Sequence, residues 1–225
     1  MSCQYKQNPM IREYYQIKDK CRQGLIKHLE KAFSVIPETE NPEILDIGCG
    51  TGVPTLWIAD KYTGAITAID TDKNALEWLQ NKIIEKDLSD KVTALNISFF
   101  DFMPNPDCYD LIIAEGFLNT VGFENGFLRI VGILKKNRHV VIHDEYKDHE
   151  KKSGFIRSRN CKIVDTIYLD EKIWWNDYYR LLESEIMAID SKQTRDLFKS
   201  DLEEVKCYRA DPGSFRSIYY LVEKL

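Results

Sequence analysis

No two of the six cysteines stand within four residues of one another in this chain of 225 residues. The sequence therefore has no Cys-x-x-Cys pair of the kind that folds around zinc, and scattered thiols predict a reducing, cytoplasmic environment. It also lacks any apolar run close to the ~20 residues that a membrane-spanning helix needs. The polar segment 1–12 has no apolar stretch like that of a secretory signal. We expect a cytoplasmic protein with no membrane partner.

Neither sign of charge is in large excess, because 31 Lys and Arg residues face 36 Asp and Glu residues, a net charge of −5. A mildly acidic total disfavours nucleic acid as the main partner, since polyanion binding depends on clustered basic residues. Hydrophobic residues at 44% and charged residues at 30% exclude a disordered chain. A chain of this length can bury one core, so we expect a single domain over residues 1–225.

One stretch departs from this balance. Residues 135–162 carry nine basic side chains against four acidic ones. Two interpretations are open for this stretch. It is either a solvated face neutralised by acids elsewhere, or a docking surface for an anionic partner such as RNA.

The apolar residues change period along the chain, between the spacing of amphipathic helices and short runs that are apolar on both faces. Such strands alternating with helices are typical of a parallel sheet covered on both sides. The sequence thus predicts a doubly wound, three-layer α/β/α fold, in which two late strands pair as an antiparallel extension. We expect helices over 10–33, 53–62, 73–88, 124–136 and much of 173–205, and strands over 43–47, 65–69, 91–97, 111–114, 139–142, 161–169 and 215–222.

A glycine-rich turn joins the first expected strand to the helix that follows it. The segment reads Ile44-Leu45-Asp46-Ile47-Gly48-Cys49-Gly50-Thr51-Gly52. Glycines allow a tight turn and a close approach of the backbone to a ligand at the carboxyl end of the strand. The alternative is an ordinary strand–helix turn.

Acidic residues follow this turn in strand order. Asp46 lies inside the first strand end, where a buried carboxylate needs a hydrogen bond or a positive ligand group. Asp70 ends the second strand, a position suited to both hydroxyls of a ribose. Asp101 follows the third strand between Phe100 and Phe102, an arrangement suited to an adenine. Each acid alone could instead cap a helix or a turn.

As a set, these residues resemble a known family, the class I S-adenosylmethionine-dependent methyltransferases, over residues 43–147. The segments that carry the resemblance are Leu45–Gly52, Ala68-Ile69-Asp70, Phe100-Asp101-Phe102 and Tyr109–Gly116. The resemblance implies a Rossmann-like, mostly parallel sheet of seven strands with an antiparallel last strand. It also implies S-adenosyl-L-methionine as the cofactor and S-adenosyl-L-homocysteine as the product.

The resemblance further implies how the cofactor is held. Its methionine portion would lie on the Gly48–Gly52 loop, its ribose on Asp70 and its adenine on Asp101. The expected cofactor-binding residues are Asp46, Gly48, Cys49, Gly50, Gly52, Asp70, Thr71, Asp101, Phe102, Glu115 and Tyr14. A nicotinamide dinucleotide is a rival ligand, but its fingerprint places the third glycine one residue later than Gly52.

Methyl transfer from a sulfonium is a direct displacement that needs no metal, although a neutral alcohol or a protonated amine acceptor also needs a base. Two strand ends supply candidates for catalytic groups, Glu115 and His143. His143 could instead pair with Asp144 or Glu145. We expect no metal, since the spacing of His143 and His149 fits neither a strand face nor a helical zinc pair. The Asn/Asp-Pro-Pro-Tyr/Phe segment of base N-methylating relatives is absent.

Four large rings occur in the six residues 174–179, within the late helical segment. Residues at this spacing share helix faces, which usually makes them core. The family uses this region as a lid over the acceptor, however, and a ring-lined pocket favours a small molecule. The expected acceptor-binding residues are Tyr15, Phe117, Trp174 and Tyr178.

We therefore predict an S-adenosylmethionine-dependent methyltransferase that acts on a small molecule. Its parts would be an N-terminal helical cap (1–42), a cofactor-binding core (43–147) and a helical lid (170–206). Two alternatives are open. One is methylation of RNA or protein through the basic stretch 135–162, and the other is a cofactor-binding protein without turnover.

Overall fold

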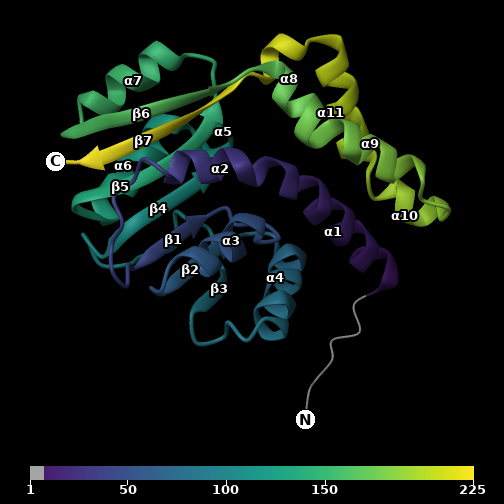
Figure 1. Cartoon of the computed structure of the whole chain (residues 1–225), viewed down its shortest axis with the longest axis horizontal. Coiled ribbons are helices and arrows are strands. Elements are labelled where there is room, and N and C mark those ends of the chain that lie inside the picture. The colour runs from purple at the N-terminus through teal and green to yellow at the C-terminus, as the bar shows by residue number, and fades with distance from the viewer. Residues whose placement is uncertain (1–7) are drawn as a thin grey trace.

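Seven strands form one sheet in the computed structural model, which describes residues 8–225 (Figure 1). Their order is β3-β2-β1-β4-β5-β7-β6. Strands β1 to β5 pair in parallel, whereas β7 is antiparallel to both of its neighbours, β5 and β6. The expected fold class is confirmed. The strands are β1 (Ile44–Ile47), β2 (Ile66–Asp70), β3 (Val92–Asn96), β4 (Tyr109–Glu115), β5 (Leu134–Glu145), β6 (Cys161–Leu169) and β7 (Ser217–Lys224).

Helices cover both faces of the sheet, which is why β1 is buried along its whole length and β4 along nearly all of it. One face packs Leu29 and Phe33 of α2 and Ile58 of α3 into a core cluster. The other packs Phe127 of α6 and Ile156 of α7. The helices on these faces are α2 (Ile26–Phe33), α3 (Val53–Lys61), α4 (Lys73–Glu85), α6 (Phe123–Ile133) and α7 (His149–Arg157), with a short α5 (Leu118–Val121).

Some expected boundaries were wrong. The helix expected over 10–33 is divided into α1 (Pro9–Arg22), a 3₁₀ turn η1 (Gln23–Leu25) and α2. The helix expected over 124–136 ends at Ile133, because Leu134 is extended and begins the long strand β5. Asn8 caps α1 by accepting from the Met10 N–H at 3.0 Å, with Pro9 in the first turn.

The chain between β6 and β7 forms a helical segment that lies beside α1 (Figure 1). Its members are α8 (Glu171–Trp174), the π-helix η2 (Trp175–Tyr179), α9 (Arg180–Met187), α10 (Lys192–Asp196) and α11 (Lys199–Ala210), and a 3₁₀ turn, η3 (Pro212–Phe215), leads into β7. Ion pairs join it to the N-terminal helices: Lys18 binds Asp201, Lys20 binds Glu185, and Asp177 accepts from both Lys27 and His28. No helix within residues 8–225 is long and apolar enough to cross a membrane.

The N-terminal helices and this segment approach each other closely at Gly24. A Cβ placed on Gly24 would stand 2.0 Å from the carbonyl oxygen of Asp177. Both partners depart from the α-helix here, one as the 3₁₀ turn η1 and the other as the π-helix η2. The missing side chain therefore sets how closely the two elements cross.

We expect Gly24→Ala to lower the free energy of unfolding by about 1–3 kcal/mol, since either the Asp177 backbone or the 3₁₀ turn must shift. Urea denaturation measures the difference. Gly154→Ala in α7 is the matched control, because a Cβ there meets no atom within 4 Å. That control should be neutral or stabilising by about 0.5–1 kcal/mol. Equal stability of the Gly24 variant and wild type would contradict the close crossing.

Candidate functional site

The glycine-rich turn after β1 needs glycine for two different reasons. Gly48, Gly50 and Gly52 have φ values of +71°, +51° and +80°, which are strained for other residues. A Cβ on Gly52 would also collide with Leu79 Cδ1 at 2.2 Å. A Cβ on Gly50 would meet no atom within 4 Å. Gly52 thus seats the turn against α4, whereas Gly50 leaves open space beside the backbone.

Asp70, at the end of β2, fixes this turn. Its Oδ2 accepts from the Gly50 N–H at 2.7 Å, and its Oδ1 accepts from the Asp72 N–H at 2.8 Å. A carboxylate offers about four acceptor sites, so each oxygen retains capacity for a further donor. A pair of vicinal hydroxyls, as in a ribose, fits the remaining capacity.

Asp46 is buried within β1 with 2% of its surface exposed. Its Oδ2 accepts from the Thr55 hydroxyl at 2.6 Å. Burial raises the pKa of Asp46 to about 7, the Thr55 hydrogen bond opposes the rise, and the charges of Glu115 and Asp70 add to it. Asp46 is therefore partly protonated at neutral pH.

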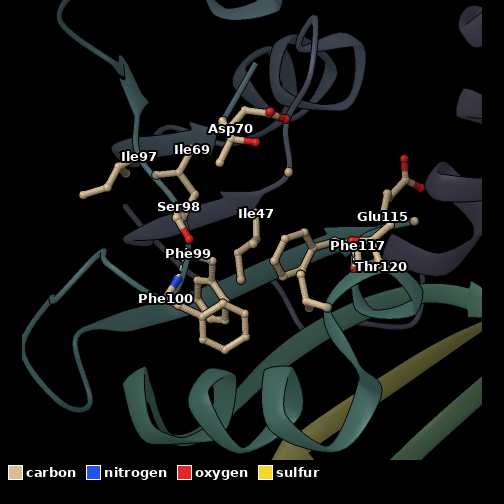
Figure 2. A pocket seen from close by; sticks show the side chains of 14 residues that line it. Ile47, Ile69, Asp70, Ile97, Ser98, Phe99, Phe100, Glu115, Phe117 and Thr120 are labelled. Carbon is tan, nitrogen blue, oxygen red and sulfur yellow. Dashed lines mark hydrogen bonds between the residues drawn. The ribbon is translucent and has the colours of Figure 1, made fainter. Parts of the chain in front are cut away.

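Two cavities open on either side of Asp70. The first, about 300 Å³, lies against Ser98, Phe99 and Phe100 after β3, and Figure 2 shows Asp70 and these side chains around it. The second, about 340 Å³, lies between the glycine-rich turn and α1. Both cavities are lined by the four residues Gly48, Asp70, Glu115 and Gly116.

The pair of cavities fits a nucleoside joined to an amino acid. The first has aromatic walls for a base, because Phe99 and Phe117 meet edge to face with centroids 5.6 Å apart. The second has glycine backbone and cationic side chains. Asp70 stands between them, where a ribose would join the two parts.

Arg22 is a site residue that the sequence interpretation missed. It ends α1 and lines the second cavity, and no carboxylate in residues 8–225 lies within ion-pair distance of it. Lys18 lines the same cavity but is paired with Asp201. Tyr15, Lys18 and Arg22 repeat at three and four residues, so helical spacing could have found Arg22 once Tyr15 was a candidate. An unpaired guanidinium suits a carboxylate.

A third cavity, about 690 Å³, opens beside the helical segment. It meets the other two at Gly116 after β4, the one residue that lines all three. Gly116 has a φ of +62°, and a Cβ there would meet no atom within 4 Å. The rings of His143, Tyr146, Trp174, Tyr179 and Phe215 line the third cavity, with Asn119, Lys147, Glu204 and Arg216 among its polar groups.

His143 is stacked between two rings. Its centroid lies 4.1 Å from that of Tyr219 and 5.9 Å from that of Trp174, with interplanar angles of 7° and 8°. Its Nε2 is 2.9 Å from Ser217 Oγ, which also accepts from Trp174 Nε1 at 3.1 Å. Burial, assisted by the charges of His28 and Arg22, lowers the pKa of His143 to about 3. The ring is therefore neutral in the physiological range and holds a proton weakly.

Most of the expected site residues line these cavities. Those that line the first two are Gly48, Asp70 and Glu115 in both, Thr71 and Phe117 in the first, and Tyr14, Tyr15, Asp46, Cys49 and Gly50 in the second. His143 and Trp174 line the third. Tyr15 and Phe117, which we expected on the acceptor side, thus lie beside the cavities that share Asp70.

Four expected residues line none of the three cavities. Gly52 packs against Leu79. Asp101 is exposed, and Phe102 is partly buried against the core. The backbone N–H groups of both donate to the Ser98 carbonyl in a tight turn. Tyr178 is buried in the core between α1 and the helical segment. In residues 8–225, no group of three or more His, Cys, Asp or Glu side chains has the arrangement of a metal site.

Comparison with known proteins agrees with this geometry. A family model described as a methyltransferase domain matches residues 38–185. The chain belongs to this family, and the expected class, the S-adenosylmethionine-dependent methyltransferases of class I with a Rossmann-like fold, is confirmed. Members of this class take S-adenosyl-L-methionine as the methyl donor.

The relatives differ in what they methylate. A tRNA1(Val) (adenine(37)-N6)-methyltransferase of Parabacteroides distasonis is 33% identical over 73 residues, 32% of this chain and 31% of its own. A release factor glutamine methyltransferase of Fusobacterium nucleatum is 25% identical over 72% of this chain and 46% of its own. The chain thus spans less than half of either curated relative.

A solved structure shows the same fold. It is the geranyl diphosphate C-methyltransferase of Streptomyces coelicolor, in complex with Mg²⁺, geranyl diphosphate and S-adenosyl-L-homocysteine. Its TM-score is 0.65 at 12% identity, covering 88% of this chain and 78% of that one.

The pKa of Asp46 gives a test of the site's electrostatics. Because the folded state holds a proton that the unfolded state releases between about pH 4 and 7, Asp46 makes the protein less stable as pH rises through this window. Asp46→Asn removes this loss, so its stability relative to wild type should rise by about 2–4 kcal/mol from pH 4 to pH 8.

Urea denaturation at several pH values measures this difference. Asp72→Asn is the matched control, since Asp72 caps α4 and an Asn caps a helix equally well. The control measures how much an Asp-to-Asn change at an exposed helix cap alters stability by itself. A pH-independent difference for Asp46→Asn would contradict a raised pKa.

Proposed function

We propose that this protein transfers a methyl group from S-adenosyl-L-methionine to a small-molecule acceptor. The observation that carries the proposal is the meeting of three cavities at Gly116. Two of them share Asp70 and suit the two halves of the cofactor, and the third is left for the acceptor. A binding protein without turnover would have no use for the third cavity at that point.

The residues of the first two cavities would hold the cofactor as follows. Asp70 accepts from the ribose hydroxyls, while Phe99, Phe100 and Phe117 surround the adenine. Arg22 binds the carboxylate of the methionine portion beside the glycine-rich turn. When bound, S-adenosyl-L-methionine supplies a methyl group on a cationic sulfonium that a nucleophile takes by direct displacement.

The aromatic walls of the third cavity favour a small acceptor. Trp174, Tyr179 and Phe215 give the cavity aromatic walls, and polar groups such as Asn119 and Glu204 stand beside them. Aromatic walls combined with placed polar groups are typical of small-molecule sites. Ring faces also attract cations, so they suit a site where a sulfonium meets its acceptor. The neighbour that binds geranyl diphosphate is an example of this fold with a small ligand.

The alternative, methylation of RNA or protein through residues 135–162, has less support. Lys135 and Arg138 both pair with Asp110, and Lys151 and Lys152 pair with Glu124 and Asp144. Strand β5 runs from Leu134 to Glu145, so its basic start lies roughly 30 Å from the site at its carboxyl end. Lys147 of this stretch does line the third cavity, but Lys135 and Arg138 lie far from it, so the basic residues do not form one surface around Gly116.

Binding of the product tests the cofactor assignment. We expect S-adenosyl-L-homocysteine to bind with micromolar affinity and Asp70→Ala to weaken it by about a hundredfold, because two hydrogen bonds to a carboxylate are lost. Calorimetry measures both. Asp60→Ala, on the exposed part of α3, is the control and should bind like wild type. Preference for NADH, or equal binding by the Asp70 variant, would reject the assignment.

Paired tryptophan substitutions test the acceptor cavity. Trp174 lines it, whereas the adjacent Trp175 stacks on Tyr208 away from it. A screen of small amines, acids and phenols for release of S-adenosyl-L-homocysteine supplies the acceptor. Trp174→Phe should then lower kcat/KM about tenfold and leave cofactor affinity unchanged, while Trp175→Phe changes both by less than about threefold. Equal effects of the two variants would support a purely structural role.

A further inference from the structure

A row of three side chains crosses the sheet at the point where the cavities meet. Glu115 of β4 is the register partner of His143 of β5, and His143 is the partner of Tyr219 of β7. Side chains in register on neighbouring strands project from the same face of a sheet. All three therefore lie on one face, beneath α1 and the helical segment.

The Tyr219 hydroxyl reaches over the His143 ring and donates a hydrogen bond to Glu115 Oε1. Tyr219 is 1% exposed, so this hydroxyl has no access to bulk water. Figure 2 shows the Glu115 carboxylate pointing away from Phe99 and Phe100. Glu115 lines both cofactor cavities and immediately precedes Gly116, where the third cavity begins.

The other titratable groups that face Glu115 come from three elements. Arg22 of α1 acts on it with a positive charge, Asp46 of β1 with a negative one, and His143 of β5 is neutral. Burial raises the pKa of Glu115, and the Tyr219 hydrogen bond and the Arg22 charge oppose the rise. Tyr219 is the only one of these groups that binds the carboxylate directly.

We propose that Tyr219 is a positioning residue that holds the Glu115 carboxylate ionised and directed at the junction of the three cavities, so that Glu115 accepts the proton that the methyl acceptor gives up. The proposal rests on the proposed function. It assigns a role to Tyr219, a residue that no motif indicates, and it makes Glu115 rather than His143 the base.

The proton transfer balances without a further reactant. The acceptor's N–H or O–H bond breaks and its proton goes to Glu115 Oε2, the oxygen that Tyr219 leaves free. A bond forms between the acceptor atom and the methyl carbon, and the electron pair of the broken S–C bond stays on sulfur. Glu115 ends as a neutral acid and returns its proton to solvent before the next turnover.

A comparison of two ligands measures the charge on Glu115 without a known acceptor. S-adenosyl-L-homocysteine has a neutral sulfur, whereas sinefungin has an ammonium group near the position of the transferred methyl. The ratio of their affinities isolates the interaction of that ammonium with Glu115. In wild type we expect the affinity for sinefungin, divided by that for S-adenosyl-L-homocysteine, to fall about tenfold as falling pH protonates Glu115.

Calorimetry from pH 4.5 to 8.5 gives the midpoint of this change for each variant. Tyr219→Phe keeps the ring on His143 but removes the hydrogen bond that favours the carboxylate. We therefore expect its midpoint to rise by about one pH unit. Tyr220→Phe is the matched control, because the Tyr220 hydroxyl lies 3.0 Å from His149 Nδ1, away from Glu115. Its midpoint should equal that of wild type.

A third variant assigns the titration to Glu115, since burial also raises the pKa of Asp46, to about 7. Glu115→Gln should bind S-adenosyl-L-homocysteine and show a low, pH-independent affinity ratio. This variant also keeps the test valid if Tyr219→Phe fails to fold. An unshifted midpoint in folded Tyr219→Phe, or a wild-type trend that persists in Glu115→Gln, would overturn the proposal. Failure of wild type to bind either ligand would instead reject the proposed function.

Discussion

The parallel register of β1 with β2 and β4, and of β4 with β5, is the constraint on which the site depends. It places the carboxyl ends of four strands side by side. The Gly48–Gly52 turn, Asp70, Glu115 and His143 therefore become neighbours although they span residues 48–143. The glycine turn then opens space above β1, and Asp70 locks the turn through the Gly50 N–H. If these strand ends did not lie together, the same residues would only form turns and cap helices.

The same strand ends bring together buried titratable groups, whose charged forms burial disfavours. Burial raises the pKa values of Asp46 and Glu115 and lowers that of His143, so all three are biased toward their neutral forms. Arg22, which ends α1, is a positive charge that opposes the effect of burial on Glu115. Its place depends on the close crossing at Gly24, which seats α1–α2 against the helical segment. Packing just outside the cofactor cavities thus affects the electrostatics within them.

The strands, the glycine turn and the acid at the end of β2 could be predicted because each has a local signature: apolar runs, closely spaced glycines and an acidic residue at a strand end. Other features depend on contacts between distant segments. Arg22 and Tyr219 have no motif, and they reach the site only through helix packing and antiparallel pairing of β7 with β5. Asp101 matched a pattern, but a turn at Ser98 directs it to solvent. Tyr178 fitted an aromatic stripe and belongs to the core.

A crystal structure with S-adenosyl-L-homocysteine bound would test most directly whether three cavities meet at a methyl-transfer centre. The account predicts ribose hydroxyls on Asp70, the amino-acid carboxylate on Arg22, and the sulfur facing Gly116 with the third cavity open beyond it. A nucleoside bound elsewhere, with Asp70 and Arg22 free of the ligand, would contradict it.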